Sequence, residues 1–483
     1  MALKPRRGTA EGAQLRPNRG RPTASRGTDR RRGAAPTRTR LLALRVLERV
    51  QRGGGYADLS LHAALGRSEL NAPDRAFATD LVYGTLRWRG RIDYLVGQVL
   101  DRDMDKLEPL VANALRLGAY QLLFAERVPV NAAVDESVRC TRAAGAERAT
   151  GLVNAVLRRL ANEHATIALP SLESAPLAHL RDALSLPEWL AERWIAQYGP
   201  EEAAALARAS NDPPPFTVRA NRQRTTRAAL LEQLRARVPV ATACRLAPDG
   251  IQLGRRGNPT RDPAFLAGDF TVQDEAAQLV VSLLDPQPGE QILDVCAAPG
   301  GKTTAIAERL GGDGTVVAVD RHRRRLDLVR RAARRLGLAG IECVERDAAQ
   351  PLGDELIGRR FDRVLVDAPC SGLGTLRRNP DARWRLRPSD LPRLADIQLA
   401  LLKHSATALR PGGVLVYSVC TVAEEENEQV VHGFLDQVEG FELARGATAP
   451  ELQSVTDGEG FLRCNPHIQD ADGFFAARFE RSK

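Results

Sequence analysis

From about Pro286 onward, short apolar segments alternate with helical ones, and this pattern constrains the fold more than any other feature of the chain. Because short apolar strands that alternate with helices form parallel sheets covered by helices on both faces, the pattern predicts a doubly wound α/β domain. Ligands bind such sheets at the carboxyl ends of the strands, so the residues that follow each strand are the candidates for a functional site. The predicted strands are 291–295, 315–320, 341–347, 361–367 and 413–419.

Two further regions precede this domain, and 483 residues are enough for about three domains. Residues 39–174 carry apolar residues at intervals of three and four, which predicts an all-helical domain. Residues 175–285 begin with two predicted helices and continue, after three prolines, as a small α/β domain. The sheet would occupy residues 286–483. The predicted helices of the first domain are 39–51, 74–100, 107–124, 133–143 and 147–163.

The net charge of +9 at pH 7 is concentrated at the start of the chain. Residues 1–40 contain 12 Lys or Arg against Glu11 and Asp29, a net +10, so residues 41–483 sum to −1. The segment 1–38 has almost no large apolar residues, and we expect it to be disordered. Either it binds a polyanion such as nucleic acid, or it is a solvated extension without a specific role.

Several observations bear on the compartment. The first 40 residues lack the apolar core of a signal peptide, and no apolar run approaches 18 residues. The seven cysteines show neither a CxxC pair nor disulfide-like spacing. These features favour a reducing cytoplasm, where a cysteine is either a core residue or a chemical group. We expect no membrane association and no metal site, and we expect a monomer.

The first predicted strand leads into CAAPGGKTT, residues 296–304, a loop of small residues that precedes a helix. It resembles a phosphate-binding loop, but that motif requires glycine where Cys296 stands, which argues against a nucleotide triphosphatase. Asp320, Asp347 and Asp367 end three successive strands. An acid there suits the ribose of an adenosine cofactor, whereas each one alone could be only a cap or turn residue. Because GxGxxG is missing, S-adenosylmethionine fits better than NAD.

Two cysteines, Cys370 in DAPCSG and Cys420 in YSVCT, follow strands at the same edge. Carbon 5 of cytosine becomes nucleophilic only after a thiolate adds to carbon 6, so an enzyme acting there needs a thiolate and a base taken out of its stack. The residues alone leave open which cysteine attacks, and the Pro-Cys dipeptide, as in DNA cytosine methyltransferases, slightly favours Cys370. We expect the following cysteines to be core residues: Cys140, Cys244, Cys343 and Cys464.

The predicted helix 321–337, RHRRRLDLVRRAARRLG, is strongly amphipathic. We expect its apolar face to cover the sheet and its arginines to be solvated, with RNA contact as a secondary hypothesis. The apolar face consists of Leu326, Val329, Ala333 and Leu336.

Four motifs, VCAAPGGKT, VDAPCSGLGTLRRNPDARWR, YSVCTVAEEENE and the terminal DGFFAARFE, together resemble those of RNA cytosine-5 methyltransferases. The helical start, with DRAFATDLVYGTLRWR and LVNAVLRRL, is similar to the NusB-like RNA-binding domain of the bacterial 16S ribosomal RNA members, the RsmB (Sun/Fmu) family. The resemblance extends over nearly all of the chain after about residue 40. It implies an all-α NusB-like domain, a small α/β domain and a Rossmann-like class I methyltransferase domain.

The resemblance further implies methylation of carbon 5 of a cytosine in 16S ribosomal RNA, at rRNA position 967, with S-adenosyl-L-methionine as the methyl donor. It assigns the attack to Cys420 and assistance in product release to Cys370, with Asp367 also facing the cytosine. The alternatives are a methyltransferase for tRNA or another substrate, and a largely non-catalytic RNA-binding assembly factor. The resemblance implies cofactor contacts from Cys296, Ala297, Ala298, Pro299, Gly300, Gly301, Lys302, Asp320, Asp347 and Asp367, with Lys302 also steadying Asp367.

Overall fold

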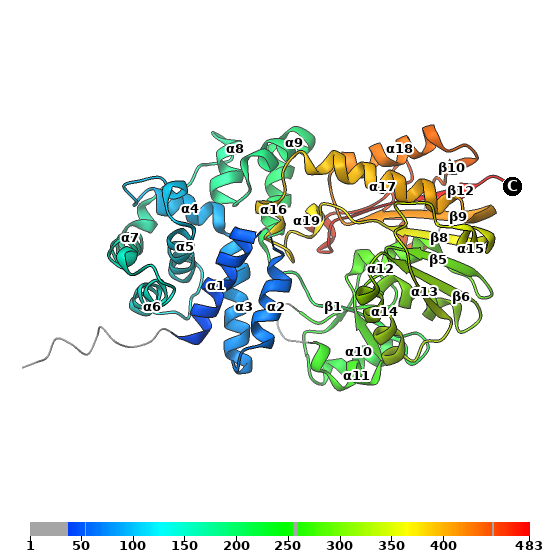
Figure 1. Cartoon of the computed structure of the whole chain (residues 1–483), viewed down its shortest axis with the longest axis horizontal. Coiled ribbons are helices and arrows are strands. Elements are labelled where there is room, and N and C mark those ends of the chain that lie inside the picture. Colours follow the sequence, from blue (N-terminus) through cyan, green and yellow to red (C-terminus); the bar gives the residue numbers. More distant parts are fainter. Residues whose placement is uncertain (1–36, 54, 255–258, 447–448) are drawn as a thin grey trace, which may run out of the picture.

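The computed structural model of the chain describes residues 37–53, 55–254, 259–446 and 449–483. It has a helical domain at the N-terminal side, a small mixed domain in the middle of the chain and an α/β domain at the C-terminal side, which confirms the predicted fold class (Figure 1). The predicted basic tail, 1–38, lies outside the described residues except for its last two. Within the described ranges, no helix combines the length and the apolar character that a membrane span requires.

The helical domain is built around α5 (Pro109–Leu123), in which every residue from Leu110 to Gln121 is buried. A helix buried on all sides lies at the centre of its domain, and the small residues of this one allow close packing. Gly84 on α3 is an example, because a Cβ there would clash with the ring of Tyr120 on α5. The surrounding helices are α1 (Arg38–Gly53), α2 (Ala57–Gly66), α3 (Ala72–Arg87), α4 (Arg89–Gly97), α6 (Val130–Ala143) and α7 (Thr150–Glu163).

Two features of this domain differ from the predicted helices. The predicted helix 74–100 is divided into α3 and α4 because Trp88 leaves the helical conformation, with φ −98° and ψ 14°. Helix α2 was not predicted. Its ten residues, ADLSLHAALG, show little separation into an apolar and a polar face, so hydrophobic periodicity gives no signal there.

The middle of the chain begins with a pair of helices, as predicted. α9 (Glu188–Asn211) is divided by Gly199, whose φ of 77° is not helical, and by Pro200. An antiparallel sheet in the order β2-β3-β1-β4 follows, and its strand β1 (Thr217–Ala220) is buried throughout. The other elements are α8 (Pro176–Ala178), α10 (Arg227–Arg235), β2 (Thr242–Ala243), β3 (Gly250–Gln252), α11 (Pro263–Ala267) and β4 (Phe270–Val272).

The C-terminal domain contains a sheet in the order β10-β12-β9-β8-β5-β6-β7, with β11 paired to β12. Strands β5 to β9 are parallel to their neighbours, and β12 runs antiparallel to β9. Three predicted strands have the observed bounds, whereas β7 ends two residues earlier and β9 begins four residues earlier than predicted. The strands are β5 (Gln291–Val295), β6 (Thr315–Asp320), β7 (Ile341–Glu345), β8 (Phe361–Asp367), β9 (Leu409–Val419), β10 (Phe441–Leu443), β11 (Leu462–Cys464) and β12 (Phe474–Arg481).

Helices cover both faces of this sheet, with α12, α13 and α14 on one face and α17 and α18 on the other (Figure 1). Helix α14 buries the four apolar residues that the sequence predicts, and it packs on β6 and β7. Helix α12 packs against α13, β9 and β12. The helices are α12 (Glu275–Leu284), α13 (Gly301–Leu310), α14 (Arg323–Leu336), α15 (Asp354–Gly358), α17 (Asp390–Ala406), α18 (Glu428–Gln437) and α19 (Pro466–Gln469).

A segment after β8 joins the sheet to the rest of the molecule around α16 (Ala382–Arg385). The guanidinium of Arg383 is buried and donates a hydrogen bond to Asn211 at 2.8 Å and three more to backbone carbonyls. Trp384 Nε1 donates to the carbonyl of Leu86 in the helical domain at 2.6 Å. The helical domain is therefore docked on the same segment that carries one of the site cysteines at its start.

Candidate active site

The parallel strands end at one edge of the sheet, where most of the predicted site residues lie. Val295 of β5 is in register with Val366 of β8 and with Val319 of β6, so the loops that follow these strands are neighbours. The site residues that end or follow the five parallel strands are Cys296, Asp320, Asp347, Asp367, Cys370 and Cys420.

The two candidate nucleophiles are in direct contact. Cys370 and Cys420 are 50 residues apart in sequence, but their Sγ atoms are 3.4 Å apart, within hydrogen-bonding distance for sulfur. Both residues are half-buried. The hydrogen bond with Cys420, followed by burial, raises the pKa of the Cys370 thiol well above its ordinary value. Either sulfur can be the donor in this contact, and the direction of the pKa shift favours the protonated form of Cys370.

A buried carboxylate that the sequence analysis missed connects the two cysteine loops. Glu426 accepts hydrogen bonds from the backbone N–H of Ser371 at 2.8 Å, from the hydroxyl of Thr421 at 3.1 Å and from the amide of Gln398 at 2.9 Å. Ser371 and Thr421 each directly follow a site cysteine. Burial raises the pKa of Glu426, and its negative charge adds to the rise in the pKa of Cys370.

The loop after β5 turns sharply before α13. Cys296 has a φ of 62°, in the left-handed region that residues other than glycine rarely adopt, and Gly300 has a φ of 105°. Burial raises the pKa of the Cys296 thiol to about 12, so this cysteine is not a third thiolate. Ala297 and Ala298 pack in a small cluster with α14, whereas Pro299 is exposed. The loop can therefore contact a ligand mainly through its backbone.

The acids at the strand ends differ from one another. Asp320 is almost completely buried, and its Oδ1 accepts from the backbone N–H of His322 at 2.9 Å. Its Oδ2 accepts no hydrogen bond within the described residues, although the guanidinium of Arg325 lies 3.5 Å away. Asp347 is exposed, lies two residues beyond β7 and accepts from the N–H of Ala349 at 3.0 Å, which is a turn contact. Of these three acids at the strand ends, only Asp320 and Asp367 are at least partly buried, and a buried Asp320 oxygen still needs a donor.

The third acid, Asp367, is held from two sides. The Nζ of Lys302 lies 2.7 Å from its Oδ2, and the hydroxyl of Ser418 donates to its Oδ1 at 2.8 Å. Lys302 is itself buried and lies over the ring of Phe474, 5.0 Å from the ring centroid. The predicted steadying of Asp367 by Lys302 is thus observed as an ion pair. Ser418 and Phe474 complete this contact, and the sequence analysis did not assign them.

Asp294, in the middle of β5, is a second buried acid that the sequence analysis missed. Its Oδ2 accepts from the hydroxyl of Thr303 at 2.6 Å, while its Oδ1 has no hydrogen-bond partner within the described part of the chain. Burial, partly opposed by the bond from Thr303, raises the pKa of Asp294 to about 7. An acid within the otherwise apolar strand QILDV was the available signal, because a buried carboxyl has to serve some purpose.

The remaining cysteines lie away from this edge. Cys140, Cys244 and Cys464 are buried, as expected, but Cys343 is only half-buried. The difference arises because Cys343 lies on β7, the edge strand of the sheet, which has a neighbour on one side only.

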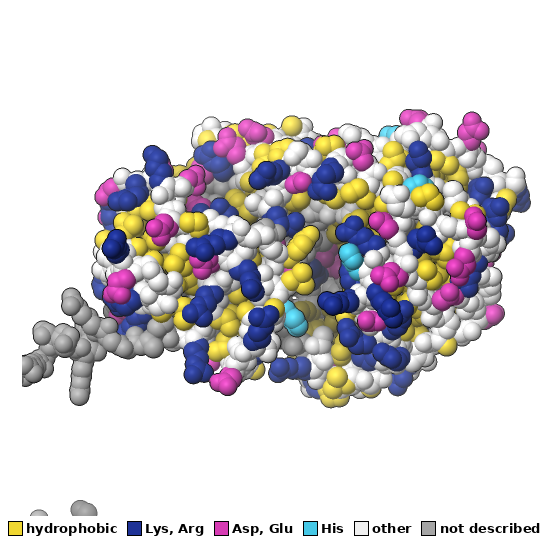
Figure 2. Space-filling view, viewed as in Figure 1, with side chains coloured by type: hydrophobic (Ala, Val, Ile, Leu, Met, Phe, Trp, Pro, Cys, Tyr) yellow, Lys and Arg dark blue, Asp and Glu magenta, His cyan; other side chains and the backbone are white. Residues whose placement is uncertain are grey.

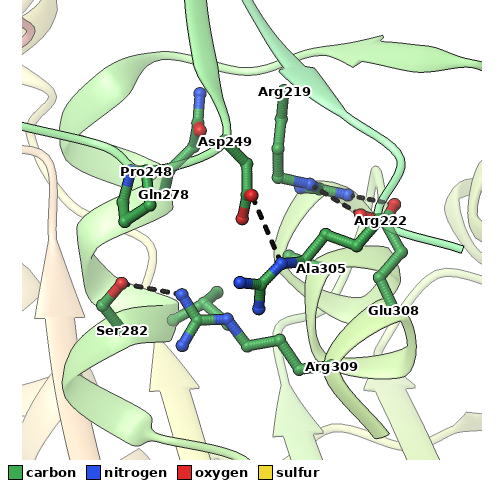
Figure 3. A pocket seen from close by; sticks show the side chains of 10 residues that line it. Arg219, Arg222, Pro248, Asp249, Gln278, Ser282, Ala305, Glu308 and Arg309 are labelled. Atoms are coloured by element: carbon green, nitrogen blue, oxygen red, sulfur yellow. Dashed lines mark hydrogen bonds and ion pairs between the residues drawn. The ribbon is translucent and has the colours of Figure 1, made fainter. Parts of the chain in front are cut away.

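A hollow between the middle domain and helices α12 and α13 is a separate feature (Figure 3). Its charged groups bind one another: Arg219 pairs with Glu308 at 2.8 Å and Arg222 with Asp249 at 3.2 Å. Arg309 donates to the hydroxyl of Ser282 at 2.8 Å. Because these groups already have partners, we assign the hollow a structural role at the contact between the two domains.

The fold and the site define a class of protein. A doubly wound sheet with an antiparallel last strand, a loop of small residues after the first strand and an acid at the end of the second is the architecture of a methyltransferase. A helical domain is joined to it. Three family models match the chain: 16S rRNA methyltransferase RsmB/F over residues 281–480, the NusB family over 37–162, and the RsmF/B-like ferredoxin-like domain over 186–259.

Similar proteins lead to the same result. The probable ribosomal RNA small subunit methyltransferase B of Bacillus subtilis is 37% identical over 443 residues, which cover 91% of this chain and 98% of that protein. The corresponding protein of Synechocystis is 38% identical, over 92% of this chain and 99% of its own length. The chain therefore belongs to the RsmB/F family of 16S rRNA methyltransferases.

A solved structure supports the fold of the catalytic part. The methyltransferase homologue from Pyrococcus horikoshii is 28% identical to this chain and superposes with a TM-score of 0.55. The match covers 64% of this chain and 99% of the archaeal one.

Proposed function

We propose that this protein methylates carbon 5 of a cytosine in 16S ribosomal RNA, the one at rRNA position 967, through a covalent adduct between Cys420 and carbon 6 of the base. The observation that carries the proposal is the 3.4 Å contact between the Sγ atoms of Cys370 and Cys420 at the carboxyl edge of the sheet. Methyl transfer to an exocyclic or ribose oxygen would require no thiol. Family membership supports the choice of RNA.

The residues present fit S-adenosyl-L-methionine. When bound, this cofactor supplies a methyl group on a sulfonium. Asp320 Oδ2, a buried acceptor without a hydrogen-bond donor in the described residues, suits a ribose hydroxyl. The backbone of the loop from Cys296 to Lys302 lies at the adjacent strand end, and Asp347 would take part from the exposed rim. Lys302 would hold the carboxylate of Asp367 in position through their ion pair.

The first chemical step belongs to Cys420. Its thiolate adds to carbon 6 of the cytosine, and the electron pair of the ring double bond moves to carbon 5, which can then attack an electrophilic methyl group. In this proposal Cys370 is the protonated partner, in keeping with the direction of its pKa shift, and it donates a hydrogen bond to the Cys420 sulfur 3.4 Å away. Such a bond stabilises the thiolate before it attacks.

Release reverses the addition. Solvent water takes the proton from carbon 5, the electron pair of that C–H bond restores the ring double bond, and the bond between carbon 6 and Cys420 Sγ breaks with its electron pair on sulfur. The thiol of Cys370, next to that sulfur, assists by hydrogen bonding to the departing group. This role requires a protonated Cys370, which agrees with the direction of its pKa shift.

The substrate is tested by methyl transfer from labelled S-adenosyl-L-methionine to unmodified small-subunit RNA and, in parallel, to tRNA. We expect label in 5-methylcytidine of the small-subunit RNA only. Label in tRNA alone would overturn the choice of substrate. RNA binding without transfer to either RNA would favour the assembly-factor alternative instead.

A further inference from the structure

The exposed side of α14 carries cations that the site described above does not use. The helix contains seven arginines and a single acid, Asp327, which pairs with Arg330 at 2.8 Å. Arg325 belongs to the candidate cofactor site, because it contacts both Asp320 and the carbonyl of Ala298. The exposed arginines of α14 that have no carboxylate partner among the described residues are Arg323, Arg324, Arg331 and Arg334.

This helix lies next to the candidate active site. It begins three residues after Asp320, which ends β6 at the edge where the site cysteines lie. Figure 2 shows Lys and Arg side chains gathered on both sides of a hollow between the helical domain and the region of α14. Arg324 and Arg334 are about 15 Å apart along the helix axis at 1.5 Å per residue. The positive charges therefore form a row along the helix and not a single compact cluster.

The clustering costs free energy unless an anion is bound. Like charges at neighbouring helix positions repel one another, and the single acid of the helix, Asp327, pairs with Arg330, so it offsets only part of the repulsion on this face. Guanidinium groups suit phosphates because they donate two parallel hydrogen bonds and remain charged at any physiological pH. A polyanion with regularly spaced phosphates therefore complements the helix better than a single small anion does.

We propose that the exposed face of α14 binds the phosphate backbone of the RNA beside the target cytosine. The inference rests on the proposed function, since it extends the RNA site of the same enzyme. Contacts to phosphates position a nucleic acid without reading its sequence. The α14 cations therefore contribute affinity and register at the active site, and the choice of target depends on other surfaces.

The test neutralises three of these arginines. A variant with Arg324→Gln, Arg331→Gln and Arg334→Gln is compared with wild type in binding to a small-subunit RNA fragment over a range of salt concentrations. Each lost phosphate contact reduces the slope of log affinity against log salt by about 0.7 to 0.9. We expect a slope lower by about 2, roughly tenfold or weaker affinity near 0.1 M salt, and convergence with wild type at high salt. Binding of S-adenosyl-L-methionine should be unchanged.

A control removes three arginines at the opposite edge of the sheet, with Arg359→Gln and Arg360→Gln just before β8 and Arg410→Gln at the start of β9. We expect a near wild-type slope for it. An unchanged slope in the α14 variant, or equal losses in both variants, would overturn the proposal. If wild type transfers no methyl group to small-subunit RNA, the proposed function fails, whereas the comparison of slopes still decides whether α14 binds RNA.

Discussion

At the scale of single residues, the carboxylate of Glu426 helps to hold the loops of the two site cysteines together. Cys370 and Cys420 follow the paired strands β8 and β9, and their loops also share a hydrogen bond from the N–H of Gly374 to the carbonyl of Cys420 at 3.1 Å. Glu426 accepts from the residue that follows each cysteine. A buried carboxylate with three donors is stable, but it leaves unsatisfied donors when it is replaced.

Glu426→Gln should therefore impair methyl transfer without unfolding the protein. The glutamine amide would place its N–H groups against the donors that the carboxylate now accepts from. The two loops would then separate, and we expect kcat to fall roughly tenfold to a hundredfold. Loss of the negative charge should also lower the pKa of Cys370, so its alkylation by iodoacetamide should extend to lower pH. The control is Glu424→Gln, an exposed acid two residues earlier. Wild-type rate and alkylation profile in the Glu426 variant would contradict this role.

Asp294 predicts a pH dependence of stability. Its pKa is about 7 in the folded protein and near 4 when unfolded, so the folded state binds the proton more tightly between these values. The associated stabilisation is present below pH 4 and is lost as the pH rises through 7. The Asp294→Asn variant stays neutral and can still accept from Thr303. Relative to it, the free energy of unfolding of wild type should fall by about 2 kcal/mol between pH 5 and pH 7. Urea unfolding at several pH values measures this difference. If the free energy of unfolding changes with pH equally in wild type and in Asp294→Asn, the prediction is wrong.

At the scale of elements, Arg219 connects strand β1 of the middle domain to helix α13. It forms a buried ion pair with Glu308, and it donates to the carbonyl of Gly301 at 2.9 Å, at the end of the candidate cofactor loop (Figure 3). The middle domain therefore supports the loop directly. Removal of one partner of a buried pair leaves an uncompensated charge, which is the costly change.

Arg219→Met should destabilise the protein by about 3 to 5 kcal/mol and weaken the binding of S-adenosyl-L-methionine. Arg222→Met, which removes a half-exposed partner of Asp249, should cost less than about 1 kcal/mol and leave that binding unchanged. Replacing both Arg219 and Glu308 by Met should restore much of the stability, because no charge remains buried. Chemical unfolding and calorimetric titration of the cofactor measure both effects. If Arg219→Met and Arg222→Met lost the same stability and the same affinity for the cofactor, this role of Arg219 would be wrong.

The bounds of a helix or strand could be predicted where they depend on the residues of that element itself. They could not be predicted where they depend on contacts with other elements. The strands 315–320 and 361–367 are largely apolar runs that end at an aspartate, and the strand 291–295 ends where the loop of small residues begins, so their bounds follow from the sequence. Helix α2 and the break at Trp88 depend on packing against other helices, which periodicity does not report. In the site, the strand-end cysteines and acids could be predicted from the order of the strands. Glu426 could not, because only the fold shows which of three consecutive glutamates is buried.

At the scale of the whole molecule, the helical domain is held against the catalytic domain through α16. Arg383 lies between them and forms no ion pair within the described residues, and burial lowers its pKa to about 9. Its hydrogen bonds to four oxygens replace the missing counter-charge. Since α16 lies in the segment that follows Cys370, RNA bound by the helical domain would have a defined position relative to the site cysteines.

Arg383→Met should loosen this docking and leave the catalytic fold intact. Methionine cannot donate the four hydrogen bonds that Arg383 makes. Each buried acceptor left unpaired costs about 1 to 3 kcal/mol of stability. We expect faster proteolysis between the two domains and a lower rate on RNA, with unchanged binding of S-adenosyl-L-methionine. Arg387→Met, at an exposed position four residues later, is the control. Proteolysis and RNA methylation at wild-type rates would show that the docking does not depend on Arg383.

The division of roles between the two cysteines is the central claim, and trapping of the covalent intermediate tests it most directly. Cys370→Ala and Cys420→Ala are each incubated with S-adenosyl-L-methionine and unmodified small-subunit RNA, and protein–RNA adducts are resolved on denaturing gels. We expect Cys370→Ala to accumulate the adduct because release is impaired, and Cys420→Ala to form none and to transfer no methyl group. An adduct with Cys420→Ala but not with Cys370→Ala, or full activity of Cys420→Ala, would contradict the account.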